Sequence, residues 1–592
     1  MTRSTLVLLW LGLMVLAACK TDPGANSDSV PYKRTSDTVI VRMEAEPDVL
    51  TPMLTLSSYS NRINQQAFFT LETLEGNSLE YQSLLLASEP EVTEIDEGDF
   101  AGGVAYDLEI HSEAVWDNGT PVTGNDYAFS LKAILNPLVS SRSAVLYRSF
   151  FTSVKAVEVD TENPKKFRVI FAPKDIQARD IVTGEIRLLP EYHYDPDGHM
   201  KDFTISDLLD PDKQDALKEN EAIMAFADFL NAPTTSTDPA NISGCGPYTV
   251  EEWTAGERII LRKKDDWWGD ALAEEYPQLR AYPETIIYSF ISNPTTALQA
   301  LRAEEIDALR AIDPQEFVSI KDDPALNEIY NFHSPASMTY YFISVNSNIP
   351  KLADKKVRQA ISYAVDVQEI IDNLYAGMGD RIASPVYRKQ NYYNSDLEPV
   401  PFDLEKASTL LAEAGWEDTN DNGIVDKMID GELTELSIQY NFVSQSETSR
   451  NIALLVQDNA RKIGIDIQPN GLEARMTMQK LRTKDYELAS AASSVTAIWN
   501  PKQSWHTEGD NRTGFGNAET DALIDEIIVT FDDDARREMY MKLQEIIYDE
   551  SVQIFLFAPQ ERIAIHKRFD AETMITNPGF NPRFFELTDE LQ

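Results

Sequence analysis

Stretches with strand-like and helix-like periodicity alternate along nearly the whole chain of 592 residues. Thr38–Met43 and Val104–Ile110 are typical of strands, whereas Asn61–Leu74 and Asp354–Leu374 are typical of helices. The two kinds of element follow one another in irregular order, which favours several mixed α/β lobes over one continuous sheet. At about 150 residues per domain, the length allows about four domains.

Two short motifs predict where individual elements begin and turn. Thr123 has the features of a helix N-cap, and Asp126 takes the place of the usual capping-box glutamate. Gly256 lies between two strand-like runs, Tyr248–Trp253 and Arg258–Arg262, and predicts a hairpin.

The chain is strongly acidic, with 52 Lys and Arg against 97 Asp and Glu and a net charge of −45. Such a charge repels phosphate backbones and anionic lipid headgroups, so we expect neither nucleic-acid binding nor broad adsorption to membranes.

The two cysteines, Cys19 and Cys245, cannot build a disulfide framework. No histidine-bearing motif lies beside Cys245, so we expect a buried, inert thiol there rather than a nucleophile.

The first residues have the features of an export signal. Arg3 precedes an apolar run, Leu6–Ala18, that is too short for a comfortable transmembrane helix. The run ends in Leu-Ala-Ala-Cys19, which resembles the bacterial lipobox, in which the cysteine is lipidated and becomes the first residue of the mature protein. We predict a signal peptide at 1–18, lipidation of Cys19 and a flexible linker at 19–36. The alternative is an ordinary signal peptide with an incidental cysteine.

No motif for bond chemistry is present in the sequence. It lacks a phosphate-binding loop, the zinc-protease helix, the nucleophile elbow and a Cys-x-x-Cys pair. The six histidines lie far apart, and the nearest pair, His193 and His199, indicates a solvated turn rather than a zinc site. Carboxylates are too abundant for the sequence to single out an acid–base pair. We predict no catalytic residue, no metal site and no cofactor.

One acidic loop, Asp418–Asp426, offers oxygen atoms at the spacing of the first half of a calcium loop, with Gly423 at the sixth position. The twelfth position is Ile429, where such a loop carries a bidentate glutamate. A turn held by side-chain-to-backbone hydrogen bonds is therefore favoured over a calcium site.

Aromatic residues are the feature of the composition that points to ligand binding, with 24 Tyr, 25 Phe and 8 Trp, several of them near turns. Most are expected in the core. Exposed aromatic walls with polar edges would suit the binding of an amphipathic organic ligand in a large cleft.

Four sequence blocks line up with one known family. The first, Tyr106–Asp126, is a strand that leads through a Trp-Asp-Asn-Gly turn into a capped helix, and the second, Gly244–Tyr248, is a Gly-Cys-Gly-Pro-Tyr turn. The third, Asp266–Gly269, is a pair of tryptophans that ends a hairpin, and the fourth, Asp354–Asp366, is a helix with the sequence Val-Arg-Gln-Ala-Ile. Leu410–Trp416 and Ile463–Ile465 follow in the expected order. Together they resemble the extracytoplasmic solute-binding proteins of ABC importers, in the oligopeptide, dipeptide and nickel class. The resemblance covers roughly Val39 to Phe557.

The resemblance implies an α/β fold of the type II periplasmic-binding-protein kind, with two large lobes joined by hinges and a smaller extra lobe. The implied boundaries are 37–74, 186–338 and 556–592 for a central lobe with an insertion at 202–238, 75–185 for the small lobe and 339–555 for the far lobe. Ligand would lie between the central and far lobes, which close by hinge motion. Most motif residues, such as Trp116, Gly119 and Arg358, would then be scaffold rather than ligand contacts.

Relatives that take peptides hold them extended by backbone pairing, and a far-lobe carboxylate holds the peptide α-amine. In this chain Ala497 aligns with that carboxylate, and no acidic residue lies between Ala489 and Pro501. A buried ammonium group without a counter-charge costs several kcal/mol. A free peptide N-terminus is therefore met by another acid, such as Glu46 or Asp48, or it is not the ligand.

The same alignment predicts further contacts in the cleft. Thr496 lies beside the position of the missing carboxylate, and Trp499 and Trp505 are expected as walls of the cleft. Tyr59 is a weaker candidate on the near lobe.

The predicted function is capture of an oligopeptide-like or other bulky solute and its delivery to the transmembrane subunits of an ABC permease. We expect a monomeric lipoprotein of the cell envelope, periplasmic or on the outer surface, that touches the membrane only through its N-terminal lipid. Two alternatives are a peptide or pheromone sensor that uses the same cleft and a secreted hydrolase, for which the sequence offers no acid–base motif.

Overall fold

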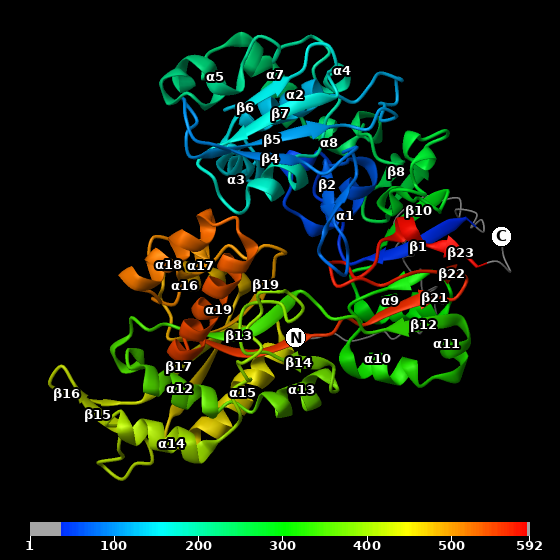
Figure 1. The fold of residues 1–592 in the computed structure, drawn as a ribbon. Helices are drawn as coiled ribbons and strands as arrows, with labels where there is room; N and C mark the ends of the chain where they lie inside the picture. The colour runs from blue at the N-terminus through cyan, green and yellow to red at the C-terminus, as the bar shows by residue number, and fades with distance from the viewer. Residues whose placement is uncertain (1–36, 589–592) are drawn as a thin grey trace, which may run out of the picture. The chain divides into compact units, whose positions relative to one another are not determined.

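The computed structural model describes residues 37–588, so the predictions for the signal peptide, Cys19 and the flexible linker lie outside the described residues. Sheets of seven, six and four strands organise this part of the chain, and we name them the central, far and small sheets (Figure 1). Three further pairs of strands are β2 (Glu72–Leu74) with β3 (Tyr81–Ser83), β15 (Asp426–Ile429) with β16 (Glu432–Glu435), and β22 (Phe569–Asp570) with β23 (Glu586–Leu587).

The central sheet joins strands that are far apart in the sequence. Its order is β12 (Tyr330–His333), β21 (Ile563–His566), β11 (Ala308–Leu309), β1 (Thr38–Met43), β10 (Thr285–Phe290), β9 (Arg258–Lys263) and β8 (Tyr248–Thr254). The predicted hairpin is confirmed: β8 and β9 are antiparallel, and Gly256 turns between them with a positive φ of 71°. Helices α9 (Pro294–Arg302), α10 (Pro314–Lys321) and α11 (Pro324–Ile329) pack on this sheet through their apolar sides.

The far sheet has the order β14 (Gly379–Arg381), β20 (Gln553–Pro559), β13 (Thr339–Val345), β19 (Leu488–Ser494), β17 (Ser437–Val443) and β18 (Asp466–Leu472). The helices of this part are α12 (Lys355–Tyr363), α13 (Val367–Tyr375), α14 (Leu404–Glu413), α15 (Glu447–Arg461), α16 (Ala474–Arg482), α17 (Lys502–Trp505), α18 (Ala518–Val529) and α19 (Asp533–Glu550). Arg358 of α12 is buried and holds the end of α19, because its guanidinium donates to the carbonyl and the carboxylate of Glu550. Its predicted scaffold role is confirmed.

The small sheet consists of β4 (Glu91–Ile95), β5 (Gly103–Glu109), β7 (Lys166–Phe171) and β6 (Val154–Val159). Helices α2 (Gly124–Leu135) and α3 (Arg142–Phe151) belong with it (Figure 1). The predicted capping box at the start of α2 is confirmed, with Thr123 and Asp126 bonded reciprocally.

The insertion at 202–238 folds into short helices that pack against α2. They are α5 (Ile205–Leu209), α6 (Gln214–Lys218), α7 (Glu221–Asn231) and α8 (Pro233–Thr237). Phe226 of α7 meets Phe129 of α2 edge to face, with ring centroids 5.9 Å apart. The lobe boundaries given by the sequence remain a prediction.

Two predicted helices are wrong in their extent. The run Asp354–Leu374 forms α12 and α13 rather than one helix, because Asp366 caps the second helix by accepting from the Glu369 amide. The run Asn61–Leu74 forms α1 (Ser58–Ala67) and then strand β2, because the chain becomes extended at Phe68. In both cases a local cap or a buried extended segment overrides the helical pattern.

The chain crosses twice between the central and far sheets, at 334–338 between β12 and β13 and at 560–562 between β20 and β21. In Figure 1 the second crossing lies in the red part of the chain that leads to β21. The two crossings pair with each other, because Ala336 bridges Gln560 and the Glu561 amide donates to the Pro335 carbonyl. The central and small sheets share one hydrophobic core, whereas the far sheet has a core of its own.

A cluster of charges anchors the central sheet beside the second crossing. The Glu44 carboxylate lies 2.8 Å from Arg62 and 3.0 Å from Arg310, and Arg310 also contacts Glu561 at 3.2 Å. Burial opposes the charge of Glu44, but Arg62 and Arg310 outweigh it and lower the pKa of this carboxyl. Arg310 therefore links strand β1 to the crossing segment.

We predict that Glu44→Gln destabilises the protein by about 3 kcal/mol or more, because it leaves buried guanidinium groups without their counter-charge. Since the folded-state pKa of Glu44 is lowered, its contribution is present at neutral pH and is lost as the pH falls through that pKa. Urea unfolding at a series of pH values measures the difference in free energy of unfolding between the wild type and Glu44→Gln. This difference should become smaller at acidic pH.

Glu94→Gln is the control, because its ion pair with Lys174 is exposed and contributes about 1 kcal/mol or less. Equal stabilities of the two variants at neutral pH would contradict the assigned role of Glu44.

Candidate functional site

Strand β19 has a free backbone edge inside the far sheet. On one side it pairs with β13 along its whole length, from Leu488 to Ser494. On the other side it pairs with β17 only through Leu488 and Ala489. From Ala491 to Ser494 no strand among residues 37–588 pairs with that side. Every second residue of such an edge directs its N–H and C=O groups outward, where they can pair with another extended chain.

The edge is free because β17 leaves β19 after a short contact. The rest of β17, up to Val443, pairs only with β18 among the described residues. Residues 490–494 of β19 are Ser-Ala-Ala-Ser-Ser, so no bulky side chain covers the edge. Ala492 and Ser494 are exposed to solvent.

A cavity of about 680 Å³ lies along this edge. Tyr340 and Phe342 of β13, Met478 of α16 and Trp499 contribute apolar walls, and serine, threonine and asparagine side chains contribute polar groups. A large cavity with apolar walls and placed polar groups is the usual form of a site for an organic ligand.

The charges that line this cavity cancel each other. Among residues 37–588, its only charged lining residues are Asp510 and Arg512, and the Arg512 guanidinium donates to the Asp510 carboxylate at 2.6 and 2.8 Å. The cavity thus presents backbone and neutral polar groups rather than a fixed charge.

Three of the residues predicted from the sequence line the cavity: Thr496, Trp499 and Trp505. Thr496 is exposed, and its hydroxyl donates to the Ile498 carbonyl at 2.6 Å. Trp499 stacks on Tyr540 with centroids 5.4 Å apart, and Trp505 meets Phe515 edge to face at 5.2 Å. Because only 8% of Trp499 and 1% of Trp505 is exposed, both mainly support the wall from behind.

Ala497 lies next to the cavity in an apolar cluster. Its neighbours there include Leu79, Tyr387 and Ile575, together with Val495. Its carbonyl accepts hydrogen bonds from Gln390 at 3.0 Å and Tyr392 at 2.9 Å. The position at which the sequence alignment predicts the amine-binding carboxylate therefore has apolar surroundings.

The structure does not bring the two acids proposed as substitutes to this cavity. The Glu46 carboxylate accepts from the Trp253 indole at 2.8 Å and from the Gly256 amide at 3.0 Å, so it holds the β8–β9 hairpin. Asp48 accepts from the hydroxyls of Thr55 and Ser60, both at 2.6 Å. Burial raises the pKa of Asp48, but these hydrogen bonds outweigh it and the net shift is downward.

Tyr59 also lies outside this cavity. It is half-buried against the core of the central sheet, and the Arg62 guanidinium lies 5.2 Å from its ring centroid. Its role as a ligand contact remains a prediction.

Sequence reasoning missed the β19 edge and the walls formed by Tyr340 and Phe342. The available signal was the run of small residues at 489–494, which is unusual for a strand at the centre of a sheet. Small residues in a strand often mark a place where another backbone approaches closely.

The other motifs singled out in the sequence have structural roles. The Asp418 carboxylate accepts from the Asn422 and Gly423 amides, and Asp426 accepts from Thr419, as in the favoured turn. Within residues 37–588 no group of three or more His, Cys, Asp or Glu side chains could hold a metal ion.

Cys245 is buried, and burial raises the pKa of its thiol to about 12. In the same part of the chain no helix has the length and apolar character needed to span a bilayer.

Comparison with known proteins agrees with the fold and the motifs. Residues 99–514 match the family described as bacterial extracellular solute-binding proteins, family 5 Middle. The chain is 23% identical over 585 residues to the oligopeptide-binding protein AppA of Bacillus subtilis (strain 168), which covers 96% of each chain.

Two solved structures show the same fold. The structure of AppA from Bacillus subtilis in complex with a nonapeptide has a TM-score of 0.66 at 21% identity, and covers 93% of this chain and 99% of AppA. The structure of NikA from Brucella suis in complex with Fe(III)-EDTA has a TM-score of 0.71 at 20% identity, and covers 93% of this chain and 100% of NikA. The predicted type II periplasmic-binding-protein fold is confirmed. The chain belongs to family 5 of the bacterial extracellular solute-binding proteins, the substrate-binding components of ABC importers.

Proposed function

We propose that this protein captures an extended, peptide-like solute along the free edge of β19 and delivers it to the transmembrane subunits of an ABC permease. The observation that carries the proposal is the unpaired backbone of Ala491–Ser494 beside a cavity of about 680 Å³. A peptide that adds a strand to such an edge gains main-chain hydrogen bonds whatever its side chains are.

The size of the edge sets the length of solute that it can hold. Four residues at about 3.3 Å each give an edge of about 13 Å, which suits a tripeptide or tetrapeptide core. The wide cavity and its neutral polar lining would accept varied side chains. The names of the relatives support this class of ligand, since AppA is an oligopeptide-binding protein and was solved with a nonapeptide.

The proposed mode of binding does not use a charged peptide N-terminus. Ala497 and its neighbours Leu79, Tyr387 and Ile575 form an apolar cluster at the end of the edge. A buried ammonium group would lack a counter-charge there. Affinity would then come from backbone pairing and the aromatic wall, not from an ion pair with the α-amine.

Delivery requires that the protein opens and closes around its solute. Within residues 37–588, the chain passes between the central and far sheets only at the paired crossings, 334–338 and 560–562. Two short segments beside each other can serve as a hinge, because few backbone torsions have to change.

We also propose that the protein acts outside the cytoplasm as a monomeric lipoprotein. The lipobox-like Leu-Ala-Ala-Cys19 supports lipidation, and the polar stretch 20–37 supports a flexible tether to the membrane. Bond chemistry forms no part of this role, which consists of capture, closure and release. Mass spectrometry of the membrane fraction tests the anchor by the mass added to Cys19.

Ala492→Trp should block peptide binding, because Ala492 is exposed and lines the cavity beside the free edge. We expect Kd for a tetrapeptide pool to rise tenfold or more, which corresponds to about 1.4 kcal/mol. Thermal shift and calorimetry with the purified protein measure this change.

Ala412→Trp is the matched control, since Ala412 is exposed on α14 and does not line the cavity. It should bind peptides as the wild type does. Unchanged affinity in the Ala492→Trp protein would show that peptides bind elsewhere or not at all.

Acetylation of the peptide N-terminus should change Kd by less than about threefold, or under about 0.7 kcal/mol. The reason is that the side chain at 497 is a methyl group in an apolar cluster rather than a carboxylate. Competition between one free and one acetylated tetrapeptide measures the ratio. If acetylation abolished binding, an acid that we have not placed at the edge would have to hold the amine.

A further inference from the structure

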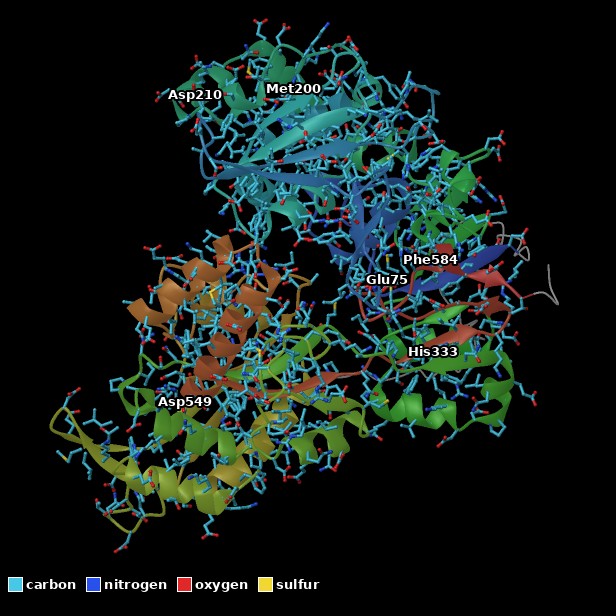
Figure 2. All side chains as sticks on the ribbon, in the orientation of Figure 1. Glu75, Met200, Asp210, His333, Asp549 and Phe584 are labelled. Atoms are coloured by element: carbon cyan, nitrogen blue, oxygen red, sulfur yellow. The ribbon has the colours of Figure 1, made fainter. Side chains whose placement is uncertain are left out.

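A smaller cavity, of about 150 Å³, lies beside the first crossing and just past the end of strand β19. The first crossing lines it through Ala336 and begins directly after His333, which is labelled in Figure 2. The rest of its lining comes from the start of β13, from Val495, from Ala558 of β20 and from the segment 380–389, which starts in β14. We name this cavity the end pocket. The proposed pairing of a solute with β19 does not use it.

The end pocket continues the cavity that lies along the free edge of β19. Tyr340 and Val495 line both cavities. Val495 directly follows Ser494, the last residue of the free edge, and its amide donates to the Met338 carbonyl at 2.6 Å. A solute that pairs with Ala491–Ser494 and extends past Ser494 therefore reaches the end pocket.

The wall of the end pocket is largely apolar. Val386 and Tyr387 are buried in it, and Ile382 and Ala558 are half-buried there. Tyr387 and Val495 pack together in one apolar cluster. An apolar group that enters the pocket would therefore exchange water for contact with side chains of its own kind.

Two serine hydroxyls in this lining already have partners. Ser384 donates to the Gln544 side chain at 3.0 Å, and Ser337 accepts from the Thr339 amide at 3.1 Å. A charged or strongly polar group inside the pocket would lose its hydration for few hydrogen bonds in return.

The charged side chains of the lining belong to the mouth of the pocket. Asp380, Arg388 and Lys389 are all exposed to solvent, and they include both signs of charge. Because water screens such charges, they do not single out an anionic or a cationic group.

We propose that the end pocket takes one apolar group, about the size of a phenyl ring, from the end of the solute that lies past Ser494. This inference rests on the proposed function. A cavity of about 150 Å³ with apolar walls can hold a benzene molecule, and burial of that much apolar surface strengthens binding. Either the side chain of a terminal residue or an apolar cap on the peptide terminus supplies the same chemistry.

The first test is calorimetry of the intact mature protein with tetra-alanine, Phe-Ala-Ala-Ala, Ala-Ala-Ala-Phe and benzoyl-tetra-alanine. We expect Kd for at least one phenyl-bearing ligand to be tenfold or more below that for tetra-alanine. The ligand that shows this gain identifies a side chain or a cap as its source. Glutamate in place of phenylalanine should lose the gain, because the pocket does not solvate a carboxylate. Equal Kd values for all four ligands would overturn the proposal.

The second test fills the end pocket by substitution. Ile382→Trp and Ala558→Phe should each remove the gain from the phenyl group, because both residues line the end pocket and not the cavity along β19. Kd for tetra-alanine should stay within about threefold of the wild-type value. Ile424→Trp is the matched control and should keep the gain, because Ile424 is also half-buried but lines neither cavity.

The results separate this inference from the proposed function. If both Ile382→Trp and Ala558→Phe kept the preference for a phenyl group, the end pocket would not hold that group, and if one variant did not fold, the other would decide. Tetra-alanine binding that Ala492→Trp abolishes, without any preference for phenyl-bearing ligands, would overturn this inference alone. Absence of binding by every peptide would overturn the proposed function and this inference with it.

Discussion

The paired crossings between the central and far sheets are the constraint on which the rest of the structure depends. At 334–338 and 560–562 the chain passes from one sheet to the other, and the bridge between Ala336 and Gln560 keeps the two passages together. Arg310 adds an ionic link from the central sheet to Glu561 on the second passage. Each sheet can therefore have its own hydrophobic core while the two remain connected through a narrow, ordered joint.

The proposed solute site follows from the way the far sheet is completed. β13 enters that sheet directly from the first crossing and β20 leaves it into the second, and the two strands lie side by side in the sheet. β19 pairs with β13 throughout but loses β17 after Ala489, which leaves backbone groups without a strand beside an aromatic wall. A binding surface made of main-chain groups is tolerant of the side chains of its ligand.

Much of the scaffold could be predicted from the sequence because its signals are local. The Thr123 capping box, the Gly256 hairpin and the buried Arg358 depend on residues within a few positions or on a motif of the family. The break at Asp366 was not predicted, because an N-cap inside a helical pattern competes with the periodicity. The site was harder to predict than the scaffold. The sequence proposed Glu46 and Asp48 as acids that could meet a peptide amine, but their carboxylates are bonded to Trp253, Thr55 and Ser60 instead. The free edge of β19 depends on where β17 diverges, and that is a tertiary property with no local signal beyond small side chains.

The central claim is that a solute pairs with the backbone of β19, and amide hydrogen exchange tests it most directly. The account predicts that saturating tetrapeptide slows exchange at the outward-facing amides of Ala491–Ser494, while exchange in the β15–β16 hairpin stays the same. Peptide that stabilises the protein without protecting any amide of Ala491–Ser494 would contradict the account.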